Sequence, residues 1–223
     1  MDHLTRTRDI LGQLIAFPTV SADSNLALIE HVAGQLAEAG ARVEVFRNAS
    51  GSKANLFATI GPDIDGGILL SGHSDVVPVA DQDWTTDPWA MTERDGRLYG
   101  RGTCDMKGFI AAAVALAPLY AQKATARPIH FAFTHDEEIG CLGAQALAPL
   151  LQERGVKPRI AIIGEPTLMR VIEGHKGCYE YSVHFTGLEG HGSAPERGVN
   201  AVEYAVHYVS HLLELREVLK VRA

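Results

Sequence analysis

Imidazole and carboxylate side chains stand just after short apolar stretches at several places in the chain. The first place is the run 68–78, where three apolar residues predict a buried strand and His73 and Asp75 follow two positions apart. Side chains at i and i+2 of an extended chain point the same way. The Asp75 carboxylate can therefore accept one imidazole N–H and leave the other nitrogen of His73 for a metal. A capped strand end that carries a histidine by chance is the alternative.

The second place is Asp105, in the glycine-rich run 100–108 that leads into an apolar helix predicted to end near residue 120. Asp105 either ligates a metal or caps the start of that helix with its carboxylate. A phosphate-binding loop is disfavoured, because the order G-x-x-x-x-G-K-[ST] is absent. Lys107 is expected on the surface or in a salt bridge.

Adjacent carboxylates follow the strand predicted at 129–133. Glu137 and Glu138 repel one another unless a cation or a shared proton compensates. Neighbouring side chains point apart, so one acid can bind a metal while the other faces the substrate as a base. Two solvated acids at the start of a helix at 142–153 are the alternative. Glu165 similarly follows a strand predicted at 159–163.

The order of these elements indicates an α/β fold. Further strands are predicted at 42–47 and 55–60, and further helices at 4–16 and 25–39. Alternating strands and helices favour a largely parallel sheet flanked by helices. Sites in such sheets form at the carboxyl ends of the strands. This topology is expected to bring together His73, Asp105, Glu138 and Glu165.

The pattern changes after residue 167. A strand is predicted at 179–185, followed by a glycine-rich loop that contains His191 and by a helix at 200–219. We therefore expect a domain boundary near residue 177, with a first domain over residues 1–177 and a second over residues 178–223.

Composition points to small-molecule chemistry. With 46% hydrophobic residues, the chain can bury a core, and a formal charge of −7 argues against a nucleic-acid surface. The longest apolar run is too short to span a bilayer, and no export signal is visible, so we expect no membrane partner and a cytoplasmic location. Cys104, Cys141 and Cys178 form no CxxC pair, which favours reduced thiols.

Four blocks, in this order, resemble the M20 family of zinc-dependent amidohydrolases and exopeptidases. They read Ser-Gly-His-Ser-Asp-Val-Val-Pro-Val, Gly-Arg-Gly-Thr-Cys-Asp-Met-Lys-Gly, Asp-Glu-Glu-Ile-Gly and Gly-Glu-Pro-Thr. Within the family, Thr-His-Asp-Glu-Glu-Ile-Gly-Cys-Leu-Gly-Ala and Gly-His-Lys-Gly look most like the acetylornithine deacetylase group. The succinyl-diaminopimelate desuccinylases are a close second. The resemblance extends over nearly the whole chain.

The resemblance implies a site for two Zn²⁺ ions, and Co²⁺ or Mn²⁺ would also suit its ligands. It implies that one ion is held by His73 and Glu165, that Asp105 bridges, and that Glu138 holds the other ion. The substrate would be a small N-acyl amino acid.

The resemblance also implies three supporting roles. Asp75 would orient His73, Glu137 would be the general base, and His191 would stabilise the oxyanion, usually across the interface of a homodimer.

One feature of the family is absent from the 223 residues. The family's fifth metal ligand is a histidine in the part of the catalytic domain that resumes after the second domain. The resemblance therefore implies an amino-terminal portion of such an enzyme. It would consist of an incomplete catalytic domain over residues 1–177 and the beginning of an α+β lid or dimerisation domain over residues 178–223. A non-catalytic module that binds metal or dimerises is the alternative.

Overall fold

A computed structural model describes residues 2–80, 82–124, 126–174, 177 and 181–222. The chain forms two compact units, Met1–Val171 and Ile172–Ala223. The predicted boundary near residue 177 stays a prediction, because residues 175–176 and 178–180 lie outside the described residues. Cys178 lies there too, and Cys104 and Cys141 are free thiols.

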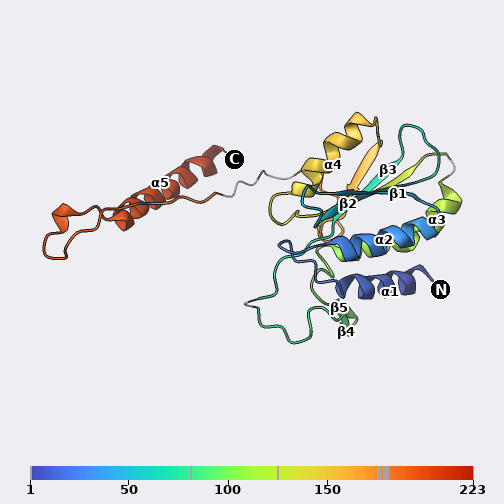
Figure 1. Ribbon diagram of the computed structural model, residues 1–223, viewed down its shortest axis with the longest axis horizontal. Coiled ribbons are helices and arrows are strands. Elements are labelled where there is room, and N and C mark those ends of the chain that lie inside the picture. The colour runs from blue at the N-terminus through green and yellow to red at the C-terminus, as the bar shows by residue number, and fades with distance from the viewer. Residues whose placement is uncertain (1, 81, 125, 175–176, 178–180, 223) are drawn as a thin grey trace. The chain divides into compact units, whose positions relative to one another are not determined.

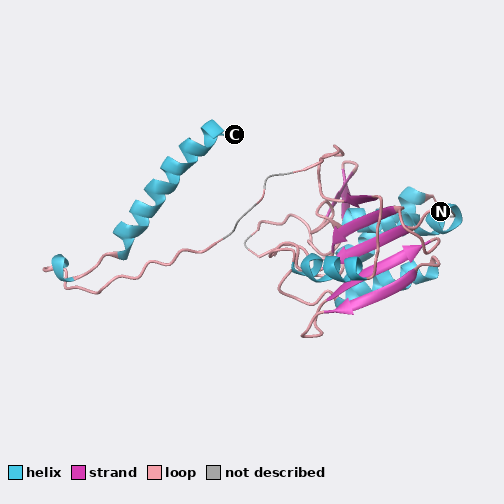
Figure 2. Ribbon diagram, turned by 90° about the horizontal axis from the view of Figure 1, so that it is seen from above, coloured by secondary structure: helices cyan, strands magenta, loops and turns pink. Residues whose placement is uncertain are grey.

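The first unit is built on a five-stranded sheet, which Figure 2 shows as a row of neighbouring strands. Its strands are β1 (Arg42–Arg47), β2 (Ala54–Ile60), β3 (Ile68–His73), β6 (Ile129–Thr134) and β7 (Ile160–Ile163). They lie in the order β1-β2-β6-β3-β7, and β2 runs against the other four. The predicted largely parallel sheet with flanking helices is confirmed.

Helices cover both faces of this sheet (Figure 1). The helices α1 (His3–Ile15), α2 (Leu26–Glu38) and α3 (Lys107–Lys123) share one face, and α4 (Leu142–Glu153) lies on the other. Successive residues of a strand face opposite sides, so Leu56 of β2 packs with the first three helices while Phe57 packs with α4. The main hydrophobic core therefore lies between the sheet and the helices α1, α2 and α3.

A β-hairpin occupies part of the segment that the sequence predicts as loop. Its strands, β4 (Thr92–Arg94) and β5 (Arg97–Tyr99), are joined by Asp95 and Gly96, whose φ angles are 53° and 70°. Two residues with positive φ form the tight turn that Asp-Gly favours between strands. The Asp-Gly pair was the signal that could have predicted this hairpin.

The second unit is described by itself. It contains a short 3₁₀ helix, η1 (Pro195–Arg197), and the long helix α5 (Ala201–Arg222). The Asn200 side-chain oxygen accepts a hydrogen bond from the Val202 amide at 3.0 Å, which caps α5 as the sequence predicts.

The strand predicted at 179–185 is wrong for its described residues, 181–185, which form no strand. A strand needs a partner to complete its ladder of hydrogen bonds. The single β-pairing among the described residues of this unit is the bridge between Leu188 and Val199. No helix in the described part of either unit is long and apolar enough to cross a membrane.

Candidate metal centre

His73 ends the interior strand β3 with its side chain almost fully buried, at 1% exposure. Its Nδ1 lies 2.8 Å from the main-chain carbonyl oxygen of Asp75 and 3.5 Å from the Asp75 carboxylate. The main-chain carbonyl is thus the nearer acceptor for the Nδ1 proton, and the carboxylate adds charge from slightly further away. Holding Nδ1 in this way directs Nε2 toward the remaining acids.

Carboxylates from three other segments surround Nε2 of His73. The nearest oxygens lie at 2.9 Å in Asp105, 3.8 Å in Glu165 and 3.9 Å in Glu137. Two groups of three residues each place one ligand atom per residue within 4.8 Å of the others: His73 with Glu137 and Glu138, and His73 with Asp105 and Glu165. The imidazole is common to both groups.

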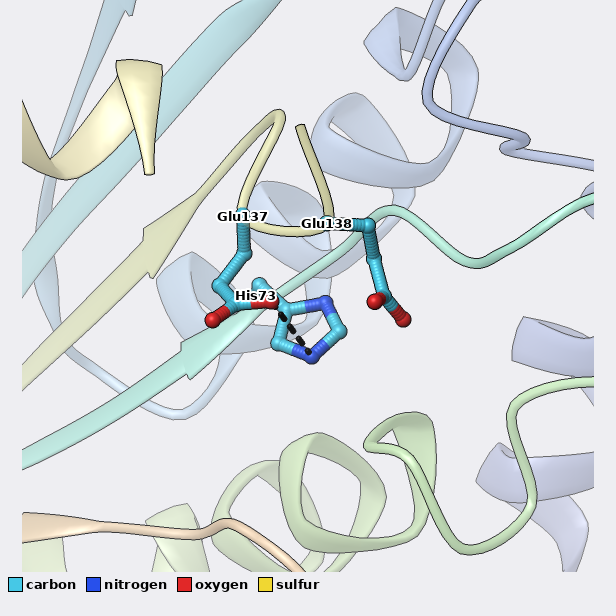
Figure 3. Close-up of side chains that lie close together, drawn as sticks. All are labelled: His73, Glu137 and Glu138. Atoms are coloured by element: carbon cyan, nitrogen blue, oxygen red, sulfur yellow. Dashed lines mark ion pairs between the residues drawn. The ribbon is translucent and has the colours of Figure 1, made fainter. Parts of the chain in front are cut away.

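The turn after β6 carries the two adjacent glutamates. Asp75 accepts a hydrogen bond from the amide of Glu137 at 3.1 Å and another from the amide of Glu138 at 3.3 Å. Figure 3 shows the two glutamate side chains flanking the ring of His73 from this single turn. The two side chains leave the main chain at successive residues, yet a carboxylate oxygen of each lies within 4.8 Å of a ring nitrogen of the same histidine.

Asp105 stands just before α3 with its side chain half exposed, at 49%. The helix is preceded by Met106 at the N-cap, and no side chain caps it, so helix capping does not account for Asp105. The expected surface position of Lys107 is wrong: its side chain is fully buried and donates to the Phe17 carbonyl at 2.7 Å. Lys107 is buried because the first turn of α3 packs beneath the loop that follows α1, and burial lowers its pKa to about 7.

Glu165 is positioned by the glycine before it. A Cβ atom built on Gly164 would lie 1.9 Å from the ring of Phe109, so a larger residue would not fit without movement. The Gly164 amide donates to the Ser71 carbonyl at 3.1 Å and continues the pairing of β7 with β3. The close approach to α3 and this hydrogen bond together fix where Glu165 leaves the sheet.

The charges of the site act strongly on one another. Burial alone would lower the pKa of His73, but the hydrogen bond and charge of Asp75, the charge of Glu165 and the hydrogen bond of Asp105 raise it to about 9. Burial opposes ionisation of Asp75 as well, yet its hydrogen bonds with His73, Ser21 and the Glu137 amide lower its pKa to about 2.

The remaining acids carry an excess of negative charge. Burial, then repulsion from Asp105 and Glu137, raises the pKa of Glu138, and burial followed by the neighbouring acids raises that of Glu165. One imidazole nitrogen and several carboxylate oxygens form a ligand set that suits zinc or manganese. The donors that are present therefore fit divalent metal ions, and a cation would relieve the repulsion between them.

Six of the seven predicted site residues lie together at the carboxyl ends of the strands, and His191 belongs to the second unit. Within that unit, His191 Nδ1 lies 2.8 Å from the Ser193 hydroxyl. Sequence reasoning missed Ser21, which donates to Asp75 at 2.7 Å, and Lys53, which pairs with Asp136. No local signal marked either one, because their partners lie more than fifty residues away along the chain.

An α/β sheet with an imidazole and clustered carboxylates at its carboxyl edge is an arrangement expected of metal-dependent hydrolases. The sequence profile described as "Peptidase family M20/M25/M40" matches residues 69–214. The chain belongs to this family.

Curated relatives include acetylornithine deacetylases. That of Proteus mirabilis (strain HI4320) is 41% identical over 222 residues, and that of Pectobacterium carotovorum subsp. carotovorum (strain PC1) is 42% identical over 223 residues. Both alignments cover 96% of this chain, but only 56% and 57% of the relatives. The chain thus spans little more than half the length of these proteins.

Solved structures agree with the fold. Human carnosine dipeptidase 1 has a TM-score of 0.62 and 26% identity, over 72% of this chain and 38% of that one. A tripeptidase from Staphylococcus aureus has a TM-score of 0.67 and 18% identity, over 94% of this chain and 56% of that one. The second match supports the fold alone, because its sequence identity is low.

Proposed function

We propose that this chain is part of an enzyme that hydrolyses the amide bond of an N-acyl amino acid with the help of bound metal ions. The observation that carries the proposal is the convergence of three carboxylates within 3.9 Å of the buried Nε2 of His73. Metal ions bound there would polarise the amide carbonyl and lower the pKa of water.

The proposed ligand set combines these two groups of side chains with the roles that the family resemblance implies. His73 and Glu165 would hold one Zn²⁺, Glu138 would hold a second, and Asp105 would bridge, with Co²⁺ or Mn²⁺ as possible substitutes. Asp75 would keep His73 in the required tautomer, through its main-chain carbonyl and its carboxylate.

Glu137 would be the general base. Its side chain is 38% exposed, so it can reach water and substrate while its amide stays bound to Asp75. As base it would accept a proton from the attacking water and pass it to the leaving amine, a transfer typically worth about 10²- to 10⁴-fold in rate. His191, supplied by the second unit of a homodimer partner, would donate to the oxyanion.

N-Acetylornithine is the proposed substrate, because the similarity to acetylornithine deacetylases extends over 96% of this chain. The products would be ornithine and acetate, which would place the enzyme in arginine biosynthesis in the cytoplasm. A succinylated diamino acid or a dipeptide is the alternative substrate. The likeness to human carnosine dipeptidase 1, at 26% identity, favours testing dipeptides as well.

The short overlap with the relatives supports a second candidate. A chain that spans 56% of a relative could be a metal-binding or dimerising module without activity of its own. A functional general base would be unnecessary in such a module, so the behaviour of Glu137 separates the two candidates.

The test compares Glu137→Ala with Glu138→Ala in the native gene product, with N-acetylornithine, N-succinyl-diaminopimelate and a dipeptide as substrates. Glu137→Ala should keep both metal ions and lose at least about 10²-fold in kcat. Glu138→Ala should lose one ion, as measured by elemental analysis. Equal metal loss in the two variants would refute the assigned roles, and an inactive wild-type protein that binds metal would favour the module.

A further inference from the structure

A buried lysine lies beneath the turn that carries the two adjacent acids. Lys53 Nζ donates to the main-chain carbonyl of Ser21 and forms an ion pair with the carboxylate of Asp136. The two charged side chains are only 11% and 7% exposed. Lys53 precedes β2, whereas Asp136 follows β6, so the ion pair joins the approach to one strand with the exit from its neighbour.

The same contacts continue to the ligands. The hydroxyl of Ser21 donates to Asp75 at 2.7 Å, and Asp75 accepts the amides of Glu137 and Glu138. Because Asp136 is joined to Glu137 by a peptide bond, the hydrogen bonds form a closed ring that starts and ends at Lys53. This ring holds both sides of the acidic turn, the segment after β6 that contains Asp136, Glu137 and Glu138.

Asp136 needs such support because of its backbone. Its φ angle is +56°, in the left-handed region, which residues other than glycine adopt at a cost of about 1 kcal/mol or more. The Asp136 side chain is held on two sides, by Lys53 and by His135 Nδ1 at 3.0 Å. The left-handed residue turns the chain where the two glutamates begin.

We propose that Lys53 is a positioning residue: by holding Asp136 and Ser21, it fixes the directions in which Glu137 and Glu138 leave the turn, and so sets the metal affinity of their side of the centre. This inference rests on the proposed function, because it assumes that the acidic turn serves a metal. Lys53 itself touches none of the predicted ligands.

A purely stabilising role explains the arrangement less well. Buried ion pairs contribute little net stability, since desolvation offsets the attraction between the charges. A second anchor also holds the turn: Asn55 accepts the His135 amide at 3.2 Å and donates to the Gly143 carbonyl at 2.8 Å. The turn should therefore stay folded without Lys53 and lose only its orientation.

The test uses Lys53→Met, Lys53→Arg and the double variant Lys53→Met/Asp136→Asn in the native protein. The double variant removes both buried charges together, which avoids an uncompensated carboxylate. Lys157→Met, at an exposed position, is the matched control. Calorimetry gives the stoichiometry and affinity for Co²⁺, the visible spectrum of bound Co²⁺ reports its coordination, and thermal unfolding reports stability.

Lys53→Met and the double variant should bind one Co²⁺ at least tenfold more weakly and change its visible spectrum. The double variant should unfold near the wild-type temperature, Lys53→Arg should recover part of the affinity, and the control should match wild type. The inference is overturned if Lys53→Met binds both ions with wild-type affinity. It is also overturned if the double variant has both the stability and the Co²⁺ affinity of the wild type. A wild-type protein without metal binding would overturn the proposed function itself, and the inference with it.

Discussion

Binding of a metal ion to His73 should release a proton at neutral pH. The acids around His73 raise its pKa to about 9 in the metal-free chain, and a metal needs the neutral imidazole. At pH 7 only about one chain in a hundred has neutral His73, which costs about 3 kcal/mol of binding free energy at about 1.4 kcal/mol per pKa unit. An ordinary histidine, with a pKa near 6.5, would cost almost nothing at this pH.

Two measurements check the proton release. Calorimetric titration with Zn²⁺ at pH 7, in two buffers with different heats of ionisation, should give about one proton released per ion bound at this histidine. The apparent affinity should rise about tenfold between pH 7 and pH 8. In His73→Gln, both the tight binding and the proton release should be lost.

The pH dependence of the stability of the metal-free chain also reports the raised pKa of His73, and the direction of that dependence is fixed. The pKa of His73 is raised in the folded state, so its stabilising contribution is complete below pH 6.5 and is lost as the pH rises through about 9. The unfolding free energy of the metal-free chain should lose about 3 kcal/mol from this histidine over that range. Zinc binding that releases no proton and changes less than twofold between pH 7 and pH 8 would refute the reasoning.

Three further predictions concern the groups that support the site. Gly164→Ala should destabilise the fold by about 1–3 kcal/mol and weaken metal binding, because the added Cβ would collide with Phe109. Gly174→Ala, with open space around it, is the control, and equal unfolding temperatures of the two variants would contradict the prediction. Asp75→Asn should lower the free energy of unfolding by about 2 kcal/mol at pH 7, because the pKa of Asp75 is lowered to about 2 in the folded chain. In urea titrations, this difference from wild type should vanish as the pH falls from about 4 to 2. Burial lowers the pKa of Lys107 to about 7, so this lysine adds stability as the pH rises from 7 to 10 and opposes the loss from His73. Lys107→Met should make stability fall more steeply over this range, and an unchanged profile would rule the explanation out.

Apart from the hairpin β4–β5, the helices and strands of the first unit were predictable because local sequence determines them. Each strand that leads to a site residue is a short apolar run, and α4 occupies the predicted range 142–153. The carboxyl ends of parallel strands meet at one edge, so the convergence of His73, Asp105 and Glu165 also follows from the pattern.

The supporting contacts could not be read from the sequence, since they join distant segments. Lys53 and Asp136 are 83 residues apart, and nothing local distinguishes a buried lysine from an exposed one before the fold brings them together. Residues 181–185, the described part of the strand predicted at 179–185, form no strand for a related reason. Their alternating pattern is typical of a strand, but a strand forms only where a partner offers a ladder of hydrogen bonds.

A protonated His73 explains how such a concentration of acids can fold before a metal arrives. Burial, followed by like charges, raises the pKa values of Glu138 and Glu165, so desolvation and repulsion of these acids both oppose folding. The imidazolium, buried among them and 2.9 Å from Asp105, supplies the opposing charge. A metal ion would then replace this proton at a site that is already formed. Folding and metal binding are therefore coupled through one histidine, because raising the pH removes the stabilising contribution of His73 to the metal-free fold while it strengthens metal binding.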